Sequence, residues 1–104
     1  MIRIQFFKRG EMLTGFESKG HANTADYGSD IVCAFVSSAC YLAANTVTEV
    51  IGLNADARAE DGYLRLSIQQ DPAKAQDILR GLQLHFSELQ KEYPDAIQFT
   101  ITEE

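Results

Sequence analysis

The chain has 104 residues, 45% of them hydrophobic and 23% charged, which is ordinary for one globular domain over residues 1–104. Its formal net charge is −6 at pH 7. This charge argues against direct binding to nucleic acid, which needs clustered Lys and Arg, and suits a basic protein partner. We expect no membrane partner, since no apolar run looks long and charge-free enough to cross a bilayer, and we expect no signal peptide. The predicted location is the cytoplasm.

Two paired strands are predicted at the start of the chain. Apolar and polar residues alternate over residues 2–6, which indicates a half-buried strand, and residues 8–11 are typical of a turn. Residues 12–18 can pair back as a second strand. Within it, Gly15 predicts a bulge or a close approach of another backbone.

A polar loop of about ten residues is predicted next, because residues 19–29 show no period. Gly20 and Gly28 lie near its two ends and would act as hinges. Ser29 or Asp30 would then cap a long helix, since either side chain can accept a hydrogen bond from a first-turn N–H.

The middle of the chain predicts the end of this helix and a β-hairpin. Apolar residues recur at helical spacing up to Gly52, a typical residue just past a helix end. Residues 54–60 and 63–70 predict two strands. They flank Asp61 and Gly62, a strong signal for a tight hairpin turn.

The last part of the chain predicts a second helix and a fifth strand. Asp71 and Pro72 suit a helix start with Asp71 as its cap, and residues 93–95 stop the helix. Alternation over residues 97–101 predicts the final strand. The predicted order is strand-strand-helix-strand-strand-helix-strand, an α+β fold with an antiparallel or mixed sheet and two helices on one face.

Cys33 and Cys40 both fall on the first predicted helix, about 10 Å apart along its axis, which is too far for a disulfide. No Cys-x-x-Cys pair or other close ligand spacing occurs, so we expect neither metal nor cofactor. A buried small hydrophobe is the ordinary interpretation of a cysteine, and we keep it for Cys40. Cys33 differs, because its predicted place in the first helical turn, after a loop with a histidine, favours a reactive thiolate.

His21 is the candidate general base for this thiol, although alone it would be a solvated loop residue. Asp30 could orient the histidine instead of capping the helix, and Asp26 is a weaker candidate for the same role. Ser37 lies one turn beyond the thiol and could bond near the sulfur, but a bond to its own helix is the ordinary role. His85 is expected on the surface of the second helix. These features alone suggest a cysteine hydrolase without specifying one.

Three short stretches around the histidine and the cysteine form one extended motif. They are Gly20-His21-Ala22, Gly28-Ser29-Asp30-Ile31-Val32-Cys33-Ala34 and Val36-Ser37-Ser38. Together they resemble the pattern Gly-His-Ala…Gly-x-Asp-Ile-Val-Cys-Ala-x-Val-Ser of the ribosomal-processing cysteine protease family, and the length and element order are similar too. Phe35 departs from the small residue common there, which bears on local packing or substrate preference.

The resemblance implies a catalytic dyad of His21 and Cys33 in a homodimeric bacterial enzyme. Its substrate would be a basic large-subunit ribosomal protein, number twenty-seven, whose short N-terminal extension is removed after a pair of aromatic residues. The mechanism implied is acyl transfer, in which backbone N–H groups at the helix start could hold the oxyanion. The loop between Gly20 and Gly28 would close over the peptide.

Two other functions stay open from the sequence. A non-catalytic module could use the same loop to grip a ribosomal partner without cutting it. A thiol redox sensor could use Cys33 as its reactive group without any need for His21.

Overall fold

The computed structural model of the chain describes residues 1–21 and 27–104, and for residues 27–30 it describes the backbone alone. The elements follow in the order β1 (Ile2–Arg9), β2 (Met12–Gly20), α1 (Tyr27–Asn45), η1 (Thr46–Ile51), β3 (Ala55–Glu60), β4 (Tyr63–Ile68), η2 (Pro72–Ala75), α2 (Gln76–Glu92) and β5 (Ile97–Glu103). Here η1 is a π-helical continuation of α1, and η2 is a 3-10 turn ahead of α2. The predicted order of strands and main helices is confirmed.

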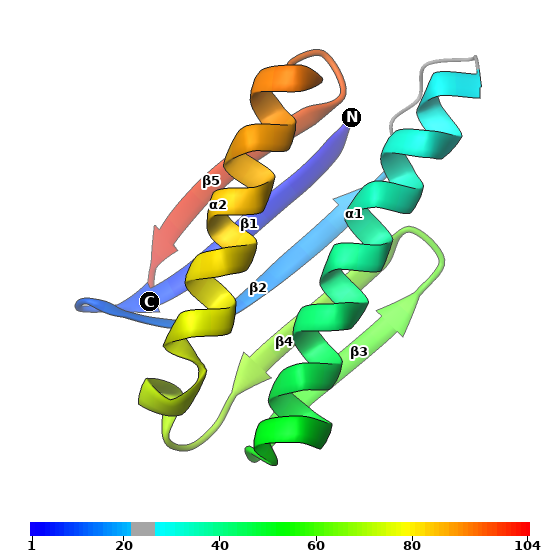
Figure 1. Cartoon of the computed structure of the whole chain (residues 1–104). Helices are drawn as coiled ribbons and strands as arrows, with labels where there is room; N and C mark the ends of the chain where they lie inside the picture. The colour runs from blue at the N-terminus through cyan, green and yellow to red at the C-terminus, as the bar shows by residue number, and fades with distance from the viewer. Residues whose placement is uncertain (22–26) are drawn as a thin grey trace.

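The five strands form one mixed sheet in the order β3-β4-β2-β1-β5. Strands β1 and β2, β2 and β4, and β3 and β4 pair antiparallel, whereas β1 and β5 run parallel. Both long helices cover the same face of the sheet, with α2 over β1 and β2 and α1 beside it (Figure 1). The predicted α+β class and the predicted placing of the helices are therefore confirmed.

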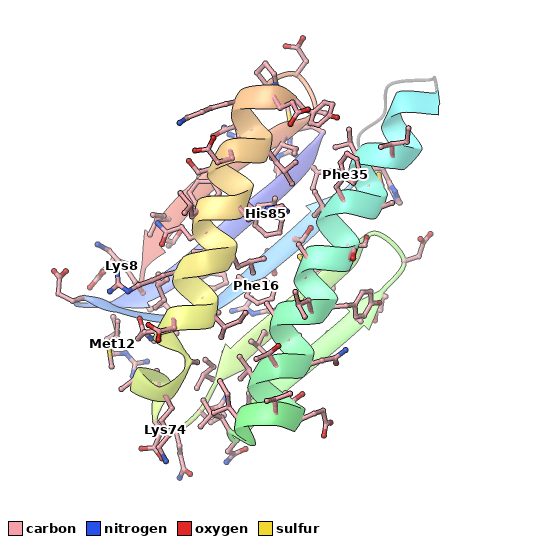
Figure 2. All side chains as sticks on the ribbon, in the orientation of Figure 1. Lys8, Met12, Phe16, Phe35, Lys74 and His85 are labelled. Carbon is pink, nitrogen blue, oxygen red and sulfur yellow. The ribbon has the colours of Figure 1, made fainter. Side chains whose placement is uncertain are left out.

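The core lies between this sheet face and the two helices. Phe6 of β1, Phe16 of β2 and Phe86 of α2 are fully buried, and the ring centroids of Phe6 and Phe16 are 5.8 Å apart. Figure 2 shows Phe16 behind the helices, on the covered face of β2. Burial of each such side chain stabilises the fold by about 1.5–3 kcal/mol. Because the alternation in the sequence places these apolar side chains on one face of the sheet, that face is the one covered by the helices.

Gly15 shows both features predicted for it. The pairing of β1 with β2 shifts register between Phe7 and Lys8, opposite the region of Gly15. A Cβ atom on Gly15 would lie 2.1 Å from the carbonyl oxygen of Leu66, so β4 approaches too closely for any side chain at this position.

The start of α1 differs from the prediction. The helix begins at Tyr27, so Ser29 and Asp30 lie inside it and neither is its N-cap. Gly28 is a helical residue and not a loop hinge, and the helix includes residues that were predicted to lie in the loop before it. Several small polar residues that favour caps lie close together here, and local preference does not choose among them.

Three further helix ends were predicted, two of them correctly, and the end of α2 at Glu92 agrees with the predicted stop at residues 93–95. Gly52 has a φ of 78° and its N–H donates to the carbonyl of Val47, so it ends η1 as predicted. Asp71 also has a left-handed φ, 56°, but its side chain makes no capping bond to any described residue. A regular N-cap residue has β-region backbone, and the left-handed backbone of Asp71 therefore explains why its side chain does not serve as a regular cap.

The segment Ile31–Ile51 corrects the expectation about membrane spans. It has 21 residues and a mean hydropathy of 1.6, so by length and composition it could cross a bilayer. A helix of a protein core passes the same test, and in this structure Val36, Cys40 and Val47 of the segment are buried against the sheet.

Candidate active site

A cavity of about 120 Å³ lies between α1, the end of β2 and the turn of the β3–β4 hairpin. Among the residues that line it are His21, Cys33, Ser37, Cys40, Asp61 and Gly62. The histidine and the cysteine that the sequence singled out therefore meet at one cavity. Ser37, the predicted supporting residue, lines it as well.

Cys33 lies in the second turn of α1, half-buried and packed against the core. It follows the first helical residue, Tyr27, by about 9 Å of helix rise. The field of the helix dipole acts mainly within the first turn, so it favours a thiolate here less than the sequence predicted. The free N–H groups of the first turn precede Cys33 along the helix, and their role as oxyanion donors stays a prediction. A thiol that lacks such a field relies on a neighbouring base when it acts as a nucleophile.

His21 immediately follows β2 and is held from two sides. The N–H of Gly20 donates to the carbonyl of Gly62 at 2.9 Å, which ties the end of β2 to the hairpin turn. Gly20 itself has a φ of 101°, and a Cβ there would lie 2.5 Å from the carbonyl oxygen of Met1. The main chain before His21 therefore lies between β1 and the hairpin, and a hinge at Gly20 stays a prediction.

Cys40 lines the same cavity but is fully buried. Burial raises the pKa of its thiol from the ordinary 9.0 to about 12, although a hydrogen bond with Ser18 acts in the opposite direction. Cys40 therefore stays a neutral thiol near neutral pH, as its interpretation as a small hydrophobe predicted. Neither Cys33 nor Cys40 forms a disulfide within the described part of the chain.

The remaining predicted residues divide into two groups. Asp26 and the side chain of Asp30 lie outside what the structure describes, so an orienting role for either stays a prediction. His85 is exposed on α2, with its ring centroid 6.0 Å from that of Phe86. Figure 2 shows it on α2, on the side toward α1, where it lines the surface between the two helices, and its predicted surface position is confirmed.

The hairpin turn is the part of the site that the sequence did not reveal. Glu60, Asp61 and Gly62 line the cavity, and the carboxylate of Glu60 pairs with Arg58 at 3.0 Å. The sequence predicted the turn from Asp61 and Gly62, but no local pattern indicated that the turn would lie beside His21. The two come together only because β2 pairs with β4.

A metal centre finds no support in the described ranges, where no group of three or more His, Cys, Asp or Glu could hold an ion. The cavity is lined by two thiols, one imidazole, two carboxylates and the hydroxyl groups of serine and tyrosine residues. A thiol and an imidazole at one cavity are the groups that a cysteine protease uses. The α+β fold and these groups thus indicate a cysteine protease.

The comparison with protein families names the family. The family model described as cysteine protease Prp matches residues 1–98, and the chain belongs to this family.

Relatives agree with this assignment. The chain is 30% identical to the ribosomal processing cysteine protease Prp of Bacillus subtilis (strain 168), over 85% of each chain. A crystal structure of a Streptococcus mutans protein is 25% identical, with a TM-score of 0.89 over 100% of this chain and 96% of that one. The S. aureus protease Prp with a covalently linked product peptide has the same fold, with 24% identity and a TM-score of 0.85 over 98% of this chain and 100% of that one.

Proposed function

We propose that this protease removes the short N-terminal extension of large-subunit ribosomal protein number twenty-seven, with Cys33 as nucleophile and His21 as general base. The observation that carries the proposal is that both side chains line one cavity. The name of the Bacillus subtilis relative, a ribosomal processing protease, supports the substrate class. The covalently linked peptide on the S. aureus protease supports a covalent mechanism.

The chemistry follows from these two groups. His21 accepts the thiol proton of Cys33, and the thiolate attacks the scissile carbonyl to give a tetrahedral oxyanion. The protonated imidazole then donates its proton to the leaving amine, and the C–N bond breaks. A water molecule, deprotonated by His21, attacks the thioester and releases the carboxylic acid, which restores the thiol.

The charge of the site suits a basic product. Asp61 and Glu60 lie at the cavity, and the whole chain carries a formal net charge of −6. An acidic surface attracts a basic polypeptide at long range and raises its local concentration. The part of the substrate that follows the scissile bond would be held there.

The proposal extends to a homodimer in the cytoplasm. A groove of about 750 Å³ runs along the outer sides of α1 and α2, and Phe35 and Leu42 on it are 41% and 65% exposed. Large exposed apolar side chains that gather in one groove mark interaction surfaces. A second copy of the chain would cover them.

The test uses a peptide that copies the extension, two aromatic residues and the basic segment after them. We expect the native chain to cut after the aromatic pair and Cys33→Ala to lose roughly 1,000-fold or more in kcat. Cys33→Ser should also lose most activity, while Cys40→Ala serves as the control and should keep it. Undiminished cleavage by Cys33→Ala would refute the proposal.

A further inference from the structure

We propose that Gly62, at the turn between β3 and β4, is a positioning residue that gives the imidazole of His21 its place at the cavity. The inference rests on the proposed function, in which His21 is the general base. It adds a residue from a part of the chain that lies outside the motif around His21 and Cys33.

The contact between the two residues leaves no room for a side chain. A Cβ atom built on Gly62 would lie 2.6 Å from Nε2 of His21 and 2.9 Å from its Cε1. Non-bonded carbon contacts have their optimum at about 3.5–4.0 Å, so a methyl group here would overlap the ring. The imidazole thus packs directly on the main chain of Gly62, and any other residue at this position displaces it.

The hairpin also fixes the main chain next to the ring. The carbonyl of Gly62 accepts the N–H of Gly20 at 2.9 Å, one residue before His21. The last pair of the β2–β4 ladder, Lys19 with Tyr63, lies directly beside this bond. Both the backbone and the side chain of His21 are therefore supported by the same turn, which the sheet holds in register.

Gly10 supplies a matched comparison. It lies in the turn between β1 and β2 with a φ of 60°, close to the 71° of Gly62. Around a Cβ on Gly10, no heavy atom of the described residues comes within 4 Å. An alanine would therefore meet the same left-handed backbone at both sites, but would collide with an imidazole only at Gly62.

The experiment compares Gly62→Ala with Gly10→Ala in the peptide assay. Both variants should melt a few degrees below the native chain, because both carry a left-handed alanine. A displacement of about 1 Å at a reacting group can cost ~100-fold, so we expect Gly62→Ala to lose at least ~10-fold in kcat with little change in KM. Gly10→Ala should keep the native kcat. Equal kcat values for the two variants would overturn the inference.

A double variant ties the effect to the histidine. In a His21→Ala background, Gly62→Ala should reduce kcat no further, because the ring that it displaces is absent. If the kcat losses of the two single variants multiply in the double variant, Gly62 acts by another route than His21, and the inference is overturned.

A spectroscopic readout separates this inference from the proposed function. The ring C–H resonances of His21 in NMR should move in Gly62→Ala and stay in place in Gly10→Ala, whatever the enzyme cleaves. Unmoved resonances in Gly62→Ala would overturn the positioning of His21. Full cleavage by His21→Ala would instead refute the proposed function, while moved resonances would still support the contact.

Discussion

Cys33 and His21 are held by different parts of the molecule. Cys33 belongs to the regular interior of α1 and packs against the core, so its position follows from the helix. His21 lies just past the end of β2, and its main chain is fixed by the bond from Gly20 to Gly62. The distance between the thiol of Cys33 and the imidazole of His21 therefore depends on how the hairpin is placed relative to α1.

We expect the buried thiol of Cys40 to lower the free energy of unfolding at alkaline pH. The folded state raises the pKa of Cys40 to about 12, so above about pH 9 the thiol ionises in the unfolded chain but not in the folded one. Stability is fully present below pH 9 and falls by about 1.4 kcal/mol per pH unit between 9 and 12.

Urea unfolding of the native chain and of Cys40→Ala at about pH 8 and about pH 10.5 checks this prediction. At the lower pH the variant should be less stable by about 1–2 kcal/mol because of the small cavity that it leaves. At the higher pH this difference should shrink or change sign. A difference that stays constant would show that the thiol of Cys40 ionises equally in both states.

At the scale of elements, Gln76 joins the start of α2 to the sheet. Its side-chain oxygen accepts the N–H of Leu13 at 2.9 Å, and its side-chain NH₂ donates to the carbonyls of Leu13 and Pro72, each at 2.8 Å. The side chain thus bridges β2 and η2, whereas the sequence predicted only a cap, Asp71, at this helix start. No local pattern marks such a bridge, because its partner lies on a distant strand.

We expect Gln76→Ala to lower the free energy of unfolding by about 1–3 kcal/mol, because partly buried groups of the main chain lose their partners. Asp71→Asn is the control, since asparagine tolerates a left-handed φ and should change stability by less than about 0.5 kcal/mol. Chemical denaturation measures both. A larger loss in Asp71→Asn than in Gln76→Ala would mean that Asp71 does stabilise the helix start.

Features that depend on residues close together in the sequence could be predicted from it. Features that depend on contacts between distant segments could not. The strands, the turn at Gly62 and the helix end at Gly52 follow from alternation and backbone preference. The start of α1 was misplaced because several cap-forming residues compete locally. The support of His21 by the hairpin was missed because only the pairing of β2 with β4 brings them together. The motif nevertheless predicted that His21 and Cys33 belong to one site, and the cavity contains both.

For the whole molecule, the exposed groove on α1 and α2 predicts self-association. We expect sedimentation equilibrium to give twice the chain mass of 11.6 kDa. Leu42→Glu, which places a charge in the groove, should shift the chain to the monomer. Leu84→Glu is the matched control, because Leu84 is 64% exposed but does not line the groove. A native monomer, or equal dissociation in both variants, would contradict this use of the groove.

The most direct test of the account asks whether the thiol of Cys33 depends on His21. The measurement is the rate of Cys33 alkylation by iodoacetamide against pH, in the native chain and in His21→Ala, with the modified residue identified by mass spectrometry. We expect the rate at neutral pH to be at least ~10-fold lower in His21→Ala, because the thiolate is the reacting form and the thiol has lost its base. The variant should reach the native rate only at alkaline pH. Superimposable profiles for the two proteins would contradict a His21–Cys33 pair.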